Sequence, residues 1–106
     1  MFFAVGAVAC WAISRYGPAM DIPPGWTRSA DGKAIERSYH FADFAAAFAF
    51  LTRVATHAEA VDHHPEFTSV WNRIDFRLTS HDAGGVTERD VGLAEAIDEI
   101  ADQPGA

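Results

Sequence analysis

The residues best suited to chemistry are three histidines in two short stretches of the chain. His63 and His64 are adjacent and stand directly before Pro65, whereas His81 follows a stretch in which apolar and polar residues alternate. Proline disfavours helical backbone in the residue before it, so a helix is predicted to end at His63-His64. A following strand could bring His81 back to that helix end. Imidazoles titrate near neutral pH, so three of them at one rim would suit proton transfer.

Composition limits the classes of function open to a chain of 106 residues. This length suits one domain with one modest core. The net charge of −7 argues against a nucleic-acid-binding surface, which needs a basic stripe. The single cysteine, Cys10, rules out an internal disulfide framework and is typical of a reducing compartment, so we expect a cytoplasmic protein.

The chain begins with an apolar run from Phe2 to Ile13. A membrane-spanning helix needs about 20 such residues, so this run is too short to cross a bilayer and no membrane partner is expected. It also lacks the basic residues that open a secretory signal. We interpret it as a first helix on the core or a poorly ordered tail. Proline and glycine breaks up to Pro24 then divide the chain into a segment at 1–23 and a domain at 24–103.

A hairpin and a long helix are predicted at the start of this domain. Asp31-Gly32 is a strong turn signal between strands at 26–30 and 33–41. Asp43 is a candidate N-cap for a helix from Phe44 to about Val61. Two adjacent apolar stripes run along this helix: Phe44, Phe48, Leu51, Ala55 and Ala58, and Ala47, Phe50, Val54 and Val61. Either the helix is well buried, or one stripe covers a sheet and the other meets a second subunit.

A long strand and a last helix complete the predicted fold. Alternation from Phe67 to Thr79 predicts a single strand that turns Val70, Ile74, Phe76 and Leu78 toward the long helix. Thr87 and Asp90 form a capping box that opens the last helix. Asp98, near the end of that helix, is interpreted as part of a solvated surface. We therefore predict an α+β fold in which a four-stranded antiparallel sheet carries about three helices on one face.

One spaced pattern in this domain resembles the signature of a known enzyme family. It reads Glu59-x3-His63-His64-Pro65-x5-Trp71-x9-His81-x8-Asp90, preceded by Pro-Gly-Trp at 24–26. The pattern is similar to that of the pterin-4a-carbinolamine dehydratases, over roughly residues 24 to 102. The apolar N-terminal run departs from the family, whose members usually begin with a polar amphipathic helix. The resemblance leads us to expect a homodimer or homotetramer.

The resemblance implies a reaction and a role for each residue of the pattern. The family dehydrates 4a-hydroxytetrahydropterin to quinonoid dihydropterin and so recycles the tetrahydrobiopterin spent by aromatic amino-acid hydroxylases, without a metal or redox cofactor. His63 and His81 are implied as the acid/base pair, with the Glu59 carboxylate tuning an imidazole or taking a proton. The implied substrate-binding residues are His63, His64, Pro65, Trp71, Ser80, His81, Asp82 and Ala83. Asp90 is explained by helix capping alone.

Two other functions compete with this prediction. Three histidines and a carboxylate can bind zinc, although adjacent histidines rarely ligate one ion together. Some members of the family act instead as non-catalytic dimerisation or assembly partners of other proteins, and the broad apolar sector of the long helix permits such a role. The presence of all three histidines favours the enzyme. His40 and His57 lie on predicted polar sides and are interpreted as solvated.

Overall fold

The computed structural model describes residues 21–103. Its elements, in chain order, are β1 (Thr27–Arg28), β2 (Ile35–His40), α2 (Phe44–Val61), β3 (Glu66–Val70), β4 (Arg73–Leu78), a 3-10 turn η1 (His81–Ala83) and α3 (Glu88–Ala101). The strands form one antiparallel sheet in the order β1-β2-β4-β3. The segment from Phe2 to Ile13, predicted as a helix or tail, lies outside the described residues. None of the helices described at 21–103 is long and apolar enough to span a membrane.

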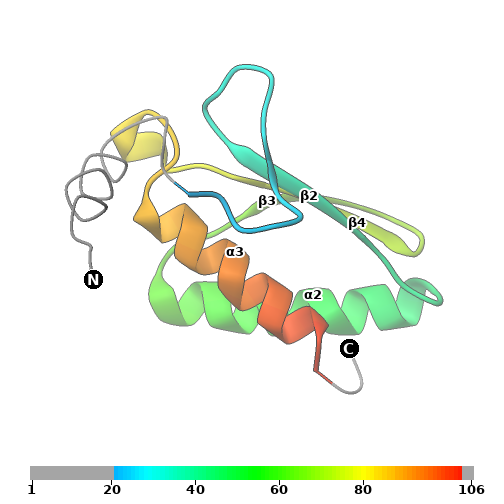
Figure 1. The fold of residues 1–106 in the computed structure, drawn as a ribbon. Helices are drawn as coiled ribbons and strands as arrows, with labels where there is room; N and C mark the ends of the chain where they lie inside the picture. Colours follow the sequence, from blue (N-terminus) through cyan, green and yellow to red (C-terminus); the bar gives the residue numbers. More distant parts are fainter. Residues whose placement is uncertain (1–20, 104–106) are drawn as a thin grey trace, which may run out of the picture.

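The fold has two layers, with α2 and α3 side by side on one face of the sheet (Figure 1). The core between the layers is aromatic at its centre, where Tyr39 and Phe76 pack around Phe50. The α+β prediction is thus confirmed. The prediction of about three helices is slightly too high, because residues 21–103 form two α-helices and only a single 3-10 turn besides.

Helix α2 has the predicted start, end and N-cap. The Asp43 carboxylate accepts a hydrogen bond from the Ala46 N–H at 2.8 Å. The side packed in the core consists of Ala47, Phe50, Leu51, Val54 and Ala58. Phe44 and Phe48 are 52% and 55% exposed, so the broad apolar sector is only half covered by this chain. Of the two interpretations, that of a well-buried helix is therefore wrong for this chain on its own.

The long strand predicted from Phe67 to Thr79 is in fact the β3–β4 hairpin. Val70 pairs with Arg73, which leaves Trp71 and Asn72 as a two-residue turn. Trp71 has φ +52°, the left-handed region that most side chains avoid. The turn is fixed by the Asn72 amide, which donates to the Phe41 carbonyl at 2.9 Å. Val70 is 51% exposed and shares the open face with Arg73, so its predicted core position is also wrong.

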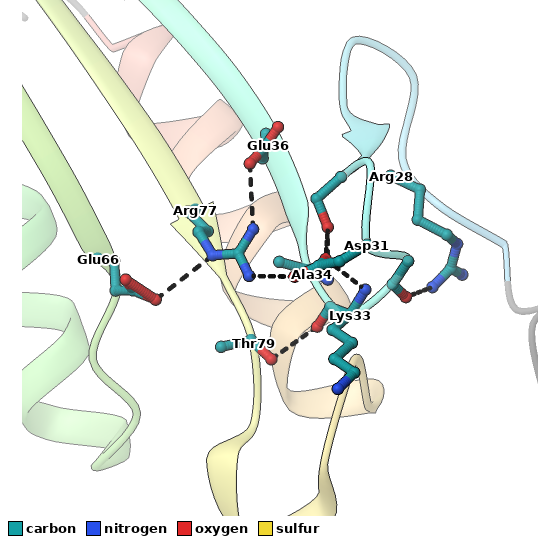
Figure 2. Close-up of polar contacts among 10 residues, drawn as sticks. Arg28, Asp31, Lys33, Ala34, Glu36, Glu66, Arg77 and Thr79 are labelled. Carbon is teal, nitrogen blue, oxygen red and sulfur yellow. Dashed lines mark hydrogen bonds and ion pairs between the residues drawn. The ribbon is translucent and has the colours of Figure 1, made fainter.

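The sheet face opposite the helices carries a network of ion pairs centred on Arg77 (Figure 2). The Arg77 guanidinium contacts Asp31 and Glu36 at 3.2 Å each and Glu66 at 3.6 Å. Asp31 belongs to the predicted hairpin turn, where hydrogen bonds from the Ser29 hydroxyl and the Lys33 N–H lower the pKa of its carboxyl to about 2. The charged side chains around Arg77 thus pair with one another on the face away from the helices.

Candidate active site

The first part of the candidate site is the end of α2. Asp62 adopts a left-handed conformation with φ 55°, and the His63 N–H donates to the Ala58 carbonyl at 3.1 Å. These are the features of a helix C-terminus closed by a left-handed residue. Because Pro65 follows, the chain leaves the helix and enters β3 at Glu66. The predicted helix exit is confirmed, and it turns the His63 side chain toward α3.

The His63 ring is bound to a buried carboxylate. Its Nε2 lies 2.6 Å from Asp90 Oδ1, and only 12% of the His63 side chain and none of the Asp90 side chain is exposed. An ionised carboxylate only accepts hydrogen bonds, so such a partner holds the ring proton on Nε2. Nδ1 is then the nitrogen that can accept or release a proton. The contact fixes both the tautomer and the direction of the ring.

The second part of the candidate site is the segment after β4. Ser80 is buried, and its hydroxyl lies 2.8 Å from Asp90 Oδ2 and 2.8 Å from the Thr87 hydroxyl. A backbone bridge between Ser80 and Gly85 closes the loop that contains η1. The 3-10 turn begins at His81, so the position of this histidine is set by its neighbour Ser80. His81 itself is exposed.

A single residue, Asp90, joins these two parts. Its Oδ1 contacts His63, and its Oδ2 accepts from Ser80 and from the Thr87 N–H at 2.9 Å. The capping box predicted for Thr87 and Asp90 is present, but it accounts for only one of the two carboxylate oxygens. The other oxygen binds the histidine, a contact that the sequence analysis did not predict. No local signal in the sequence indicated this contact, because His63 lies 27 positions before Asp90.

An ion pair links the 3-10 turn to the first turn of α3. Arg89 Nη2 donates to Asp82 Oδ1 at 2.7 Å. This hydrogen bond lowers the pKa of the Asp82 carboxyl, and the nearby His63 ring lowers it further. The turn that carries His81 and Asp82 is thus tied to the first turn of α3, which also holds the Asp90 carboxylate bound to His63. Ala83 ends the same turn and is exposed.

His64 points to a different side of the helix end from His63. Its Nε2 lies 2.9 Å from Glu59 Oε1, and both side chains are well exposed, at 56% and 82%. His64, Pro65 and Glu59 line an apolar groove of about 380 Å³ that also contains Phe48 and Phe67. His63 instead lines a smaller hollow between α2 and α3. The two adjacent histidines thus face separate hollows in this chain.

Trp71 is the one predicted site residue that the fold places far from the histidines. β3 starts beside Pro65 and runs away from it to the turn at Trp71, and β4 runs back toward His81. The β3–β4 turn and η1 consequently lie at opposite ends of the sheet (Figure 1). Trp71 is 67% exposed at that far end. Within one chain, it cannot stack on a ligand held between His63 and His81.

The described residues offer little to a metal ion. No three His, Cys, Asp or Glu side chains within 21–103 meet in an arrangement that could hold one. The ligand sets of structural and catalytic zinc sites need at least three such groups. The contacts that the structure does show here are those of the buried Asp90 carboxylate with the His63 ring and with the hydroxyl of Ser80, the residue before His81.

This fold and this pattern define a family. The chain belongs to the pterin 4 alpha carbinolamine dehydratase family, whose model matches residues 15–100. The family prediction is thereby confirmed, and its name denotes lyases that remove water.

Two relatives are similar to this chain over most of its length. A protein of Rhizorhabdus wittichii, provisionally named a pterin-4-alpha-carbinolamine dehydratase, is 56% identical over 79% of this chain and 87% of its own length. One of Bordetella avium with the same provisional name is 50% identical over 83% of this chain and 82% of its own.

Solved structures show the same architecture. A transcriptional coactivator/pterin dehydratase from Brucella melitensis superposes with a TM-score of 0.71 at 42% identity, covering 74% of this chain and 83% of that one. A pterin dehydratase-like protein identified as a RuBisCO assembly factor of the alpha-carboxysome has a TM-score of 0.64 at 20% identity, covering 74% and 92%. The second likeness concerns the fold alone.

Proposed function

We propose that this protein converts 4a-hydroxytetrahydropterin to quinonoid dihydropterin and water, in the recycling of tetrahydrobiopterin. Membership of the dehydratase family supports the class of reaction. The observation that carries the proposal is Asp90, which holds the His63 ring with one oxygen and the Ser80 hydroxyl, next to His81, with the other. This shared carboxylate supports a site in which His63 and His81, from distant parts of the sequence, act together.

The chemistry requires two proton transfers and no external electron source. The C4a–O bond breaks, the N5 lone pair becomes the second bond of an N5=C4a iminium, and the oxygen leaves as water once it is protonated. A proton is then lost from the ring system, which gives the neutral quinonoid product. Histidine suits both transfers because its unperturbed pKa of about 6.5 lets it hold or accept a proton near neutral pH.

The two proposed catalytic histidines differ in how firmly they are held, because His63 is bound to Asp90 and His81 is exposed. His63, fixed through Nε2, presents Nδ1 in a constant direction and is proposed to act at the 4a-hydroxyl with His81 as its partner. Ser80, Asp82 and Ala83 are proposed to contact the pterin along the turn. His64 and Pro65 are proposed to hold the substrate from the other side, with Glu59 orienting the His64 ring through the contact at 2.9 Å.

An assay of dehydration with the purified protein tests this proposal. Wild-type protein should accelerate loss of water from a 4a-hydroxytetrahydropterin, and His63→Ala or His81→Ala should lower kcat by about 100-fold or more. His40→Ala is the matched control, because His40 is also exposed but lies opposite Arg73 in the β2–β4 pairing, beside the β3–β4 turn. Full activity in either site variant would refute the assigned acid/base pair. An inactive wild type would refute the function.

Self-association is proposed on a separate observation. Phe44, Phe48 and Phe67 are each about half exposed, and β3 is hydrogen-bonded on one side only in the described part of the chain. An uncovered strand edge beside exposed apolar side chains favours pairing with another chain. We propose a homodimer or homotetramer in the cytoplasm, serving an aromatic amino-acid hydroxylase pathway. Light scattering should give wild-type protein a mass that is a multiple of the chain mass, and Phe48→Glu should lower this measured mass. A monomeric wild type would refute the proposed self-association.

A further inference from the structure

Strand β3 lies at one edge of the sheet, and within residues 21–103 it pairs only with β4. All of its residues are exposed, and the side chains of Phe67 and Val70 are about half exposed. Free edges in natural proteins are usually protected by lysine, proline or inward-pointing charges. The only charged residue of β3 is Glu66, and the strand contains no lysine or proline. This edge thus lacks the features that keep a strand from pairing with another chain.

The β3–β4 turn determines which backbone groups of β3 point outward. In a two-residue hairpin the pair that closes the turn, here Val70 and Arg73, is hydrogen-bonded, and such pairs alternate along the ladder. Phe67 and Ser69 therefore turn their N–H and C=O groups away from β4. A second copy of β3 can lie antiparallel to the first about a twofold axis. The register that pairs all of these groups with their counterparts in the partner places Thr68 opposite the partner's Thr68.

The side chains of β3 are compatible with this register. Glu66 lies opposite the partner's Val70, so no two like charges face each other across the interface. Phe67 lies opposite the partner's Ser69, and residues opposite each other share one face of an antiparallel sheet. The helices of both copies are then on the same side of a continuous sheet. The pairing also covers apolar side chains that one chain leaves exposed.

The same register brings one residue of the partner to the candidate site. One position beyond each end of β3, Pro65 comes to lie opposite the partner's Trp71, on a strand about 4.8 Å away. In its own chain Trp71 is 67% exposed and lies at the far end of the sheet from the histidines. Pro65, His64 and Phe67 line the apolar groove of about 380 Å³ beside α2, so the groove borders the pairing directly.

We propose that two copies of this chain pair through β3 and that Trp71 of the partner subunit forms an aromatic wall beside His64 and Pro65. This inference rests on the proposed dehydratase function, in which His64 and Pro65 hold the substrate. Trp71 belongs to the same spaced sequence pattern as the histidines, yet a single chain keeps it away from them. The second copy supplies the residue that each site lacks.

A cysteine cross-link tests the register without any assay of activity. In a Cys10→Ser background, Thr68→Cys should give a covalent dimer on mild oxidation, because the two Cα atoms are expected about 4.5 Å apart, within the range of a disulfide. Ser69→Cys is the matched control, since Ser69 lies opposite Phe67 of the partner subunit and should not cross-link. Both positions are exposed, so neither change disturbs the core. A covalent dimer with Ser69→Cys, or none with Thr68→Cys, would overturn the pairing.

Substitution of Trp71 tests its role in binding. Trp71→Ala should raise KM for a 4a-hydroxytetrahydropterin about tenfold, because loss of an aromatic contact weakens binding by about that factor. The value of kcat should stay within about twofold of wild type. Trp71→Phe keeps an aromatic ring and is the matched control, with KM near that of wild type. Light scattering should show both variants as oligomers. An unchanged KM in Trp71→Ala would remove Trp71 from the site.

Mixed dimers test whether Trp71 acts across the interface. A Trp71→Ala subunit paired with a His63→Ala subunit keeps its own histidines and receives Trp71 from its partner. Co-expression of the two variants should therefore give more activity at low substrate concentration than the sum of the two measured alone. Activity equal to that sum would contradict supply by the partner. Wild-type protein without dehydratase activity would refute the proposed function, whereas the cross-link would still decide the pairing.

Discussion

Helix α3 carries two aspartates, Asp90 and Asp98, that accept hydrogen bonds from other parts of the molecule, and the two differ in the kind of partner they bind. Asp90, in the first turn, receives His63, Ser80 and the Thr87 N–H. Asp98, slightly more than two turns later, receives the Trp26 indole N–H at 3.0 Å, the Arg37 guanidinium at 2.9 Å and the Tyr39 hydroxyl. Each carboxylate has three partners, all distant in sequence at Asp98 but including the neighbouring N-cap residue Thr87 at Asp90, and together they attach both ends of α3.

The partners make the difference between the two ends. Arg37 is permanently charged, and Trp26 and Tyr39 are core side chains, so the Asp98 cluster ties the first hairpin to α3 as a structural joint. At Asp90 the partner is the imidazole of His63, which borders an open hollow between α2 and α3. This difference in partners is the reason that we propose a catalytic role beside Asp90 and a structural role for Asp98.

The largest predicted effect on stability is at Asp90. Asp90→Ala removes a fully buried carboxylate that accepts from the His63 ring, the Ser80 hydroxyl and the Thr87 N–H. Buried donors that lose their partner are expensive, so the free energy of unfolding should fall by about 3 kcal/mol or more. Chemical denaturation of the variant and wild type measures this free energy. A decrease as small as that expected at a surface position would show that Asp90 does not hold α3 to the rest of the fold.

Asp98→Ala should have a smaller effect on stability. The Asp98 side chain is 27% exposed, so water can reach part of the cluster and replace some of the lost hydrogen bonds. We expect a fall of about 2 kcal/mol in the free energy of unfolding and no loss of kcat. The interpretation of Asp98 as part of a solvated surface, made from the sequence, is wrong, because the carboxylate accepts hydrogen bonds from Trp26, Arg37 and Tyr39. A denaturation curve for Asp98→Ala that matches wild type would contradict its role in stability.

The smallest effect appears at alkaline pH through Tyr39. Burial, followed by the hydrogen bond to Asp98, raises the pKa of the Tyr39 hydroxyl well above its ordinary value of about 10. The folded state keeps this proton while the unfolded state loses it above that value. The stability contributed is therefore present below pH 10 and declines as pH rises, by about 1 kcal/mol at pH 11. Tyr39→Phe should show a shallower decline between pH 9 and 11, and identical slopes would disprove the contribution.

Local sequence signals predicted the elements well. Asp43 ahead of a long apolar run fixed α2, and Thr87 with Asp90 fixed the start of α3, because caps depend on residues within one turn. The β3–β4 turn was not predicted, since it places Trp71 in a left-handed conformation that favours glycine. The alternation of apolar and polar residues continues through the turn and gives no sign of it. Two strands were therefore predicted as one, and Val70 was assigned to the core face.

Contacts between distant residues limited the prediction of the site. The capping box explained Asp90, so the pattern gave no reason to assign its other oxygen to a residue 27 positions away. Asp98 likewise had no local partner, and its three donors come from residues 59 to 72 positions earlier in the sequence. The type and spacing of the histidines indicated the chemistry. Which carboxylate holds which ring depends on tertiary packing and required the structure.

The most direct test of this account compares kcat for dehydration in Asp90→Asn and Asp98→Asn. Both substitutions keep the size of the side chain and remove its charge. Asp90→Asn should lower kcat by about 100-fold, because the His63 ring loses the partner that fixes its tautomer and direction. Asp98→Asn should keep kcat within about twofold of wild type, because its cluster does not touch the histidines. Equal kcat values in the two variants would contradict the claim that Asp90 positions His63 for proton transfer.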